Sequence, residues 1–280
     1  MTVLEVLQST AAYFKKRAVE SPRLNAEHLL AHVLGRKRID LYVDFDRPLA
    51  EAELAPLREL VRRRGQGEPL QHLLGTVEFC GRIFLSDKRA LIPRPETEEL
   101  VEMLVSECRL RTGPLRILDV GTGSGVIALS LAAALPEAEV HAIDVSEEAL
   151  ALARENAARL ELTERVQFRR SDLMTSVTEF YDLIAANLPY VPTTDRGTLS
   201  REVLRDPELA VFGGAVGDEI IRQLIVAARA HLAPGGLLAL EIGLGQYEAL
   251  AAFLAQQNYH DISQRHDCAG VTRFLLARYG

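Results

Sequence analysis

The sequence predicts an α/β protein with a doubly wound, mainly parallel seven-stranded sheet, preceded by a small all-helical domain and a β-hairpin linker. Three observations support this fold class. Apolar residues in 1–70 recur at helical spacing, residues 71–87 alternate between apolar and polar, and strand and helix patterns alternate from about residue 90. Such alternation is typical of a parallel sheet that is covered by helices.

Residues 1–70 are predicted to form a helical bundle, because one apolar face repeats along each segment. Leu4, Leu7, Ala11 and Phe14 illustrate the spacing in the first segment. Ser21-Pro22 and Leu34-Gly35 are typical helix boundaries. In the linker, residues 71–89, Gly75 and Gly81 flank alternating residues and favour a hairpin.

The remaining domain, residues 90–280, supplies the predicted sheet. Strands are expected at 116–120, 139–145, 165–170, 181–187 and 236–242, and two more near 260–265 and 272–277, with helices between most of them.

Composition excludes several classes of protein. With 48% hydrophobic and 25% charged residues, the chain resembles an ordinary globular protein. No apolar run approaches the roughly 20 residues that span a bilayer, and no secretory signal pattern opens the sequence. The three cysteines are far apart and form no C-x-x-C pair, which argues against a disulfide framework or a zinc–thiolate site. We therefore expect a cytoplasmic protein.

Charge and histidine placement bear on possible partners. The formal net charge of −7 makes nucleic acid an unfavoured direct substrate. The basic run 58–64, which includes Arg62, Arg63 and Arg64, fits either a solvated helix face or an RNA contact. His28 and His32 have a spacing that could bind zinc, but no third ligand lies nearby in the sequence, and we expect no metal.

The strongest motif is a glycine-rich turn between the first sheet strand and a helix. It reads Gly121-Thr122-Gly123-Ser124-Gly125, after Asp119. Glycines allow a sharp turn and a close approach of a ligand to the backbone. Val126 replaces the last glycine of a dinucleotide fingerprint, and the phosphate-binding G-x-x-x-x-G-K-[ST] pattern is absent. The loop therefore suits a ligand without a pyrophosphate, such as an amino acid linked to a nucleoside.

Two further candidates follow neighbouring strands. Asp144 ends the second strand, at an offset where an acidic residue accepts hydrogen bonds from ribose hydroxyls. Asp172 and Leu173 follow the third strand and could hold the adenine amino group and face. Together with the glycine loop these residues resemble class I S-adenosylmethionine-dependent methyltransferases, and the resemblance implies S-adenosylmethionine as the cofactor.

The predicted chemistry site follows the fourth strand, at Asn187-Leu188-Pro189-Tyr190. The lone pair of an amide or exocyclic amine nitrogen is delocalised, so such a nitrogen is a poor nucleophile. The side-chain carbonyl of Asn187 and the backbone carbonyl of Leu188 could accept both of its N–H bonds. Pro189 would stiffen the turn, and Tyr190 would offer a flat wall for a planar acceptor. Asn187 is also counted among the residues near the cofactor.

A longer resemblance narrows the acceptor. It rests on Asp206 to Ala210, on Gly213 and Gly214, on Leu240 to Gly243 followed by Gln246, and above all on Leu91-Ile92-Pro93-Arg94-Pro95-Glu96-Thr97-Glu98. Over nearly the whole chain these segments resemble the protein-(glutamine-N5) methyltransferases of peptide chain release factors. The resemblance implies that the glutamine of a Gly-Gly-Gln motif in class 1 release factors is methylated and that the helical domain docks the factor.

One position departs from that family. Leu188 stands where the family usually has proline, and Asn-Leu-Pro-Tyr is typical of rRNA adenine dimethyltransferases. An adenine-N6 methyltransferase acting on rRNA or DNA is therefore the alternative. A protein of the same fold that binds a partner without turnover is a third hypothesis, which the intact segment from Asn187 to Tyr190 disfavours.

Overall fold

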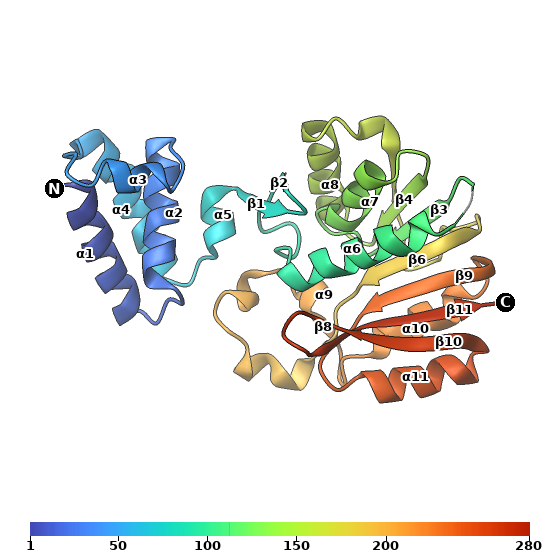
Figure 1. Ribbon diagram of the computed structural model, residues 1–280. Helices are drawn as coiled ribbons and strands as arrows, with labels where there is room; N and C mark the ends of the chain where they lie inside the picture. The colour runs from blue at the N-terminus through green and yellow to red at the C-terminus, as the bar shows by residue number, and fades with distance from the viewer. Residues whose placement is uncertain (112) are drawn as a thin grey trace. The chain divides into compact units, whose positions relative to one another are not determined.

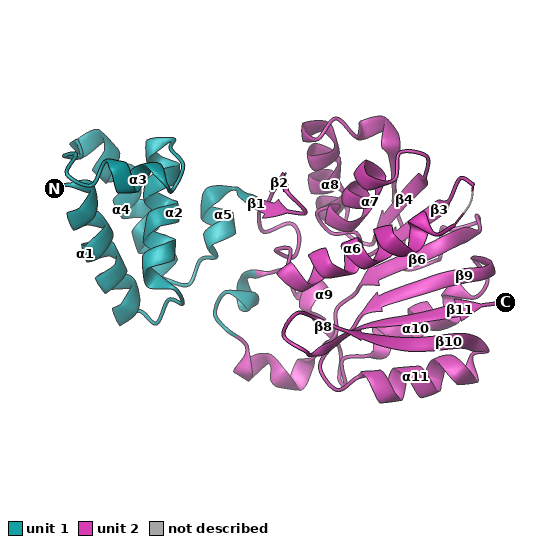
Figure 2. Cartoon of the chain, in the orientation of Figure 1, with its two compact units in different colours: residues 1–76, 200–205 teal, residues 77–199, 206–280 magenta. Residues whose placement is uncertain are grey.

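The computed structural model describes residues 1–111 and 113–280. The chain divides into two compact units, coloured separately in Figure 2. Unit 1 comprises residues 1–76 together with 200–205, and unit 2 comprises residues 77–199 and 206–280.

Unit 1 is helical and has its own core. Its helices are α1 (Val3–Lys16), α2 (Pro22–Leu34), α3 (Asp40–Val43), α4 (Glu51–Gly65) and α5 (Leu70–Leu74), and residues 200–205 contain the short helix η3 (Val203–Arg205). Thr2 caps α1 in a capping box with Glu5, and Gly35 ends α2 in the left-handed conformation. Phe14 and Leu29 are fully buried in the core of this unit.

The basic run on α4 is paired with carboxylates inside unit 1. Arg62 contacts Glu59 and Arg63 contacts Glu68, while the buried Arg64 bonds to Asn25 at 2.7 Å. The side-chain Nη2 of Arg64 also lies 2.6 Å from a carboxylate oxygen of Glu202, which belongs to the segment 200–205 of the same unit. These contacts give the run a structural role in holding unit 1 together.

The hairpin is shorter than the range 71–89 in which the sequence analysis expected it. Residues 70–74 form α5, which ends where Gly75 adopts a positive φ of 71°. The two strands, β1 (Thr76–Phe79) and β2 (Arg82–Leu85), follow directly. Phe79 and Phe84 meet edge to face with ring centroids 6.0 Å apart, and both are buried in the core of unit 2.

Unit 2 contains the predicted seven-stranded sheet (Figure 1). The strand order is β10-β11-β9-β6-β3-β4-β5. The five strands from β9 to β5 are parallel to one another. β11 runs antiparallel to β9, and the edge strand β10 runs antiparallel to β11. The strands are β3 (Arg116–Val120), β4 (Glu139–Asp144), β5 (Val166–Arg170), β6 (Tyr181–Asn187), β9 (Leu232–Glu241), β10 (Tyr259–His266) and β11 (Thr272–Tyr279). The predicted fold class is confirmed.

Helices cover both faces of this sheet, because alternate strand residues point to opposite sides. Ile117, Leu183 and Ala239 pack with α6 (Pro95–Arg109) and α7 (Val126–Ala134) on one face. Leu118 and Ile184 pack on the other face with α10 (Glu219–Ala228) and α11 (Tyr247–Gln256). Between these elements lie α8 (Glu147–Arg159), α9 (Glu208–Val211), β7 (Val191–Pro192), β8 (Phe212–Gly214), η1 (Thr163–Arg165) and η2 (Thr193–Thr198).

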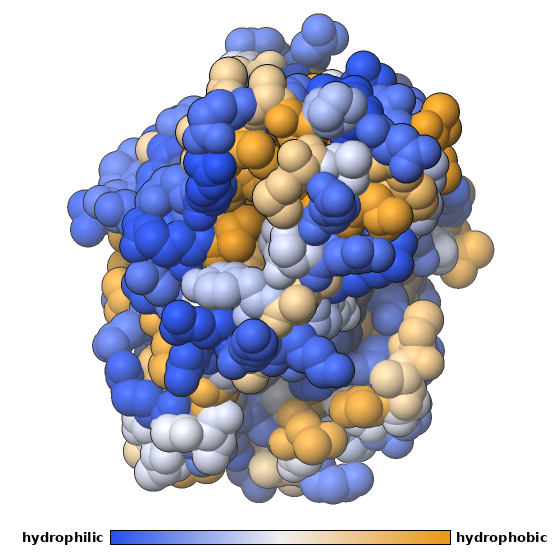
Figure 3. Space-filling model, turned by 90° about the vertical axis from the view of Figure 1, so that its left-hand side faces the viewer, coloured by the Kyte–Doolittle hydropathy of each residue, from blue (hydrophilic) through white to orange (hydrophobic). Residues whose placement is uncertain are grey.

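The visible surface is mixed. Figure 3 shows a face on which hydrophilic residues surround smaller hydrophobic groups. Among exposed apolar side chains, Ile39 and Val43 of unit 1 and Leu209 and Leu244 of unit 2 are more than half exposed. Within residues 1–111 and 113–280, no helix has the length and apolar character needed to cross a membrane.

Candidate active site

A pocket of about 490 Å³ opens at the carboxyl ends of β3, β4, β5 and β6. Ligands of open parallel sheets bind at this edge, because the strand-to-helix loops meet there. Ten of the twelve residues that the sequence predicts for the site line it: Gly121, Thr122, Gly123, Ser124, Asp144, Asp172, Leu173, Asn187, Leu188 and Pro189. The pocket thus brings together side chains and backbone from four strands of unit 2.

The glycine loop turns sharply between β3 and α7. Gly121, Gly123 and Gly125 have φ values of +72°, +56° and +85°, a region that other residues rarely adopt. The backbone N–H groups of Gly121 and Thr122 both donate to the carbonyl of Ile143 at the end of β4. Gly125 differs from the others, because it is the N-cap residue of α7 and packs against α8 instead of lining the pocket.

Asp144 supports this loop as well as lining the pocket. Its Oδ2 accepts a hydrogen bond from Gly123 N at 2.9 Å, and its Oδ1 accepts one from Ser146 N at 2.8 Å. Burial raises the pKa of Asp144, while the backbone N–H donors oppose that rise. Ser146, not Asp144, caps α8, because its hydroxyl accepts from Ala149 N.

A second carboxylate, Asp119, lies beneath the loop and is not among the site residues predicted from the sequence. It is completely buried, and its Oδ2 accepts from the Thr122 hydroxyl at 2.6 Å and from Ala128 N at 3.1 Å. Burial raises the pKa of Asp119 to about 7. The signal in the sequence that could have identified Asp119 was its position two residues before the first glycine of the loop.

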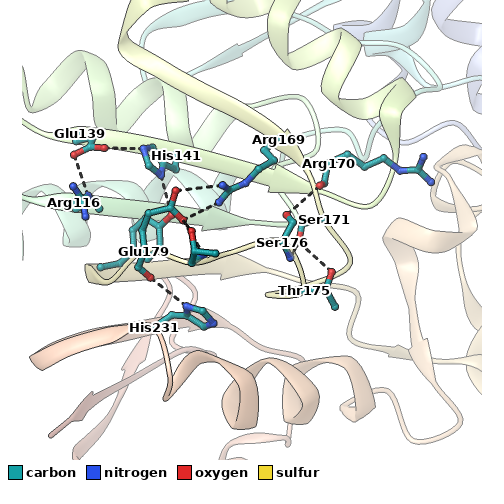
Figure 4. A network of polar contacts seen from close by, with 12 residues as sticks. Arg116, Glu139, His141, Arg169, Arg170, Ser171, Thr175, Ser176, Glu179 and His231 are labelled. Carbon is teal, nitrogen blue, oxygen red and sulfur yellow. Dashed lines mark hydrogen bonds and ion pairs between the residues drawn. The ribbon is translucent and has the colours of Figure 1, made fainter.

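The loop after β5 carries Asp172 and Leu173 and is shaped by serine hydroxyls. The Ser171 hydroxyl donates to the Leu173 carbonyl at 2.7 Å. It also accepts a hydrogen bond from Ser176 N at 3.1 Å, and Figure 4 shows these two serines side by side. Leu173 has a φ of +45°, which is unfavourable for a residue with a Cβ. The serine contacts therefore hold Leu173 in a strained conformation at the pocket wall.

Asn187 is the last residue of β6, and buried polar side chains hold its amide group in place. Its Nδ2 donates to the Thr97 hydroxyl at 3.0 Å, and that hydroxyl donates to Glu241 Oε2 at 2.8 Å. Thr97 and Glu241 are 2% and 1% exposed. Since the nitrogen of the amide is engaged by Thr97, its Oδ1 is the atom left to serve a ligand in the pocket. Neither Thr97 nor Glu241 was singled out as a site residue from the sequence.

The segment after Asn187 is packed tightly against glycines. A Cβ on Gly217 would lie 2.5 Å from the Tyr190 carbonyl oxygen, and one on Gly213 would collide with the Pro189 carbonyl oxygen. Gln246 donates from Nε2 to the same Tyr190 oxygen at 3.1 Å. These contacts fix the path of the backbone that carries the Leu188 and Pro189 carbonyls.

Tyr190 itself does not line the pocket, although the sequence analysis placed it there as a stacking wall. Its side chain is partly buried and lies against Gly243. A Cβ on Gly243 would lie only 3.2 Å from the Tyr190 ring carbon Cδ2. Burial raises the pKa of Tyr190 to about 12, so the phenol stays neutral at physiological pH.

Two segments that are distant in sequence meet beside the pocket. Asp206, which is buried, accepts from Arg94 Nη2 at 2.7 Å and from Ile92 N at 3.3 Å. Leu91, Pro93, Pro207 and Ala210 line the pocket next to this ion pair. The pair joins the segments 91–98 and 206–210 at the edge of the pocket.

Other candidates have structural explanations. Glu98 accepts from Cys80 N at 2.8 Å and so ties α6 to the hairpin turn. In the described part of the chain, no group of three or more histidine, cysteine or acidic residues could hold a metal ion. His28 and His32 therefore have no third ligand within that part.

Comparison with known proteins agrees with this geometry. Residues 5–75 match the family model for the PrmC N-terminal domain, and residues 96–210 match that for the methyltransferase small domain. A methyltransferase from Pyrococcus furiosus shares the fold, with a TM-score of 0.53 and 21% identity over 70% of this chain and 87% of its own.

Two curated relatives are similar over their whole length. The release factor glutamine methyltransferase of Geobacter sulfurreducens is 40% identical over 100% of this chain and 97% of its own length. That of Deinococcus radiodurans is 41% identical over 99% of both chains. With this identity across both units, the chain belongs to the release factor glutamine methyltransferase family of S-adenosylmethionine-dependent enzymes.

Proposed function

We propose that this protein transfers a methyl group from S-adenosylmethionine to the side-chain amide nitrogen, N5, of the glutamine in the Gly-Gly-Gln motif of class 1 peptide chain release factors. The observation that carries this proposal is the Asn187 amide at the pocket wall, with its nitrogen engaged by Thr97 and its oxygen left for an acceptor. The names of the relatives support the substrate.

The pocket suits the cofactor. Gly121 and Gly123 present backbone without side chains to it, and the Asp144 carboxylate stands at the end of the next strand. We assign the loop from Gly121 to Gly125 to the amino-acid part of the cofactor, with Gly125 acting through its packing. Asp144 would accept the ribose hydroxyls, and Asp172 and Leu173 would hold the adenine. When bound, S-adenosylmethionine supplies an electrophilic methyl group.

The remaining chemistry is positioning of the acceptor. A glutamine amide has two N–H bonds, and we assign the Asn187 Oδ1 and the Leu188 carbonyl as their acceptors. Holding both N–H bonds directs the nitrogen lone pair toward the methyl carbon. Pro189 and the contacts to Gly213 and Gly217 keep these carbonyls in place. Tyr190 would contribute through packing of this segment, since it lies outside the pocket wall.

Unit 1 is assigned to docking of the release factor. Its core is separate, and every residue that lines the described pocket lies at position 88 or beyond. An enzyme with this substrate would work in the cytoplasm, where translation terminates. If unit 1 docks the factor, an intact release factor should show a much lower KM than a short peptide that carries Gly-Gly-Gln, with a similar kcat.

The direct test uses radiolabelled S-adenosylmethionine with a purified class 1 release factor. We expect label on the intact factor and none after its acceptor glutamine is changed to alanine. A parallel incubation with cell extract, separated into protein and RNA, tests the adenine-N6 alternative. Undiminished labelling of the alanine variant, or label in RNA alone, would overturn the glutamine assignment.

A further inference from the structure

We propose that Glu241 is a positioning residue that acts through Thr97 to determine which way the Asn187 amide faces. The proposal rests on the function proposed above, since it explains how the oxygen of the Asn187 amide is kept facing the acceptor glutamine. It concerns a buried side chain that lies behind the pocket wall and outside the pocket lining.

The sheet brings these side chains together. Asn187 and Glu241 are the last paired residues of the parallel neighbours β6 and β9, so their side chains project from the same face. α6 covers that face and contributes Thr97 from its first turn. The result is a chain of two hydrogen bonds, from Asn187 Nδ2 to Thr97 Oγ1 and from Thr97 Oγ1 to Glu241 Oε2.

The negative charge of Glu241 determines which atoms donate and which accept in these two hydrogen bonds. An ionised carboxylate can only accept hydrogen bonds, so the Thr97 hydroxyl must donate to it. The Thr97 oxygen can then only accept, and the part of Asn187 that can donate to it is the NH₂ group. The two ends of an asparagine amide have nearly the same shape, so hydrogen bonding decides their placement. If the Asn187 amide were reversed, its NH₂ group would face the glutamine, whose own N–H bonds need a hydrogen-bond acceptor at that place.

Protonation of Glu241 would remove that constraint. A neutral carboxyl group can donate to Thr97, and Thr97 could then donate to Asn187 Oδ1 with the amide reversed. Burial raises the pKa of Glu241 to about 7, and Glu96 of α6 adds to the rise. The hydrogen bond from Thr97, the charge of Arg273 on β11 and a hydrogen bond from the Asn187 side chain lower this pKa. The neutral Tyr190 phenol is the other titratable group that faces Glu241. Activity should therefore fall as the pH drops through about 7.

The test compares steady-state methylation of a release factor by the wild type and by Glu241→Gln across pH 5.5 to 9, a range of about two units either side of neutrality. Glutamine keeps the size of the side chain and mimics its neutral form. We expect kcat at high pH to fall roughly 10- to 100-fold, a typical consequence of a misplaced catalytic group. The low-pH limb of the wild-type profile should be absent in the variant. Cofactor affinity should stay unchanged, because Glu241 does not line the pocket.

A matched pair of variants keeps the test valid if Glu241→Gln fails to fold. Thr97→Val removes the hydroxyl at constant size and should lower kcat to a similar extent, whereas Thr97→Ser restores the hydroxyl and should recover most of the activity. Glu98→Gln, on the same helix turn, is the control that should retain the wild-type profile. Its carboxylate contacts the hairpin turn at Cys80 and lies outside the pocket.

The outcomes separate this inference from the proposed function. If the wild type methylates the factor but Glu241→Gln keeps the wild-type kcat and acid limb, Glu241 has no positioning role. Equal activities of Thr97→Val and Thr97→Ser would lead to the same conclusion. If the wild type fails to label the glutamine at all, the proposed function itself is wrong, and Glu241 then orients no acceptor site for a glutamine.

Discussion

Leu188 contacts the glycine loop at Gly121, so that the motif after β6 packs directly on the motif after β3. A Cβ on Gly121 would lie 2.7 Å from Leu188 Cδ2, and Leu188 is only 5% exposed. The sequence indicated a role for the backbone carbonyl of Leu188 alone. Its side chain has a second role, because it fills the space that the missing Cβ of Gly121 leaves open.

Gly121→Ala should therefore be costly. The positive φ of +72° at this position costs an alanine about 1–2 kcal/mol, and the new methyl group also displaces Leu188. We expect lower stability in chemical denaturation and weaker binding of S-adenosylmethionine by calorimetry. Adding Gly121→Ala to a Leu188→Ala background should cost less than adding it to the wild type, because the collision partner is gone. Strict additivity of the two changes would show that the contact is unimportant.

Asp144→Ala should weaken cofactor binding. Loss of hydrogen bonds to a charged group costs about 1.5–3 kcal/mol, and the Gly123 N–H would also lose its acceptor. Calorimetric titration with S-adenosylmethionine measures the effect. Glu147→Ala is the matched control, since this exposed acid lies three residues away, pairs with Arg154 and does not line the pocket. Unchanged affinity in Asp144→Ala would remove Asp144 from the site.

Asn187→Ala should separate chemistry from cofactor binding. Loss of one oriented polar contact in a transition state typically lowers kcat by on the order of a hundredfold. The affinity for S-adenosylmethionine should fall far less, because the Asn187 amide is assigned to the acceptor. Single-turnover methylation of the release factor and calorimetry with the cofactor measure the two effects. Comparable losses in both would place Asn187 at the cofactor instead.

The buried Asp119 should make stability depend on pH. Its pKa is raised to about 7 in the folded chain from an ordinary value of 3.8, so the folded state holds a proton that the unfolded state releases. The free energy of unfolding should therefore decrease as the pH rises from about 4 to about 7, by a few kcal/mol in order of magnitude. Above that range Asp119 contributes no further change.

Asp119→Asn isolates this contribution. The variant should show a shallower decrease of unfolding free energy between pH 5 and 8 in denaturant titrations, an interval chosen to bracket neutrality. The decrease of unfolding free energy that remains in the variant is expected from Glu241, because the pKa of Glu241 is raised in the folded state as well. Identical slopes for the wild type and Asp119→Asn would mean that Asp119 titrates normally.

Much of the fold could be predicted from the sequence, because the deciding signals are local. Helical spacing in residues 1–70 and strand–helix alternation afterwards reflect the side-chain periods of the two structures. The positions of Gly121, Asp144 and Asn187 at strand ends placed them at one sheet edge, since parallel strands share their direction. The extent of the hairpin was less predictable, because α5 depends on the conformation of Gly75.

The supports of the site were decided by tertiary structure alone. Glu241 lies beside Asn187 because β9 pairs with β6, and Thr97 joins them because α6 crosses that face. Likewise Asp206 meets Arg94 across more than a hundred residues of sequence. The sequence by itself determined the motifs and the order of the elements. Which buried polar groups satisfy one another depends on distances across the folded core, and no local pattern encodes those distances.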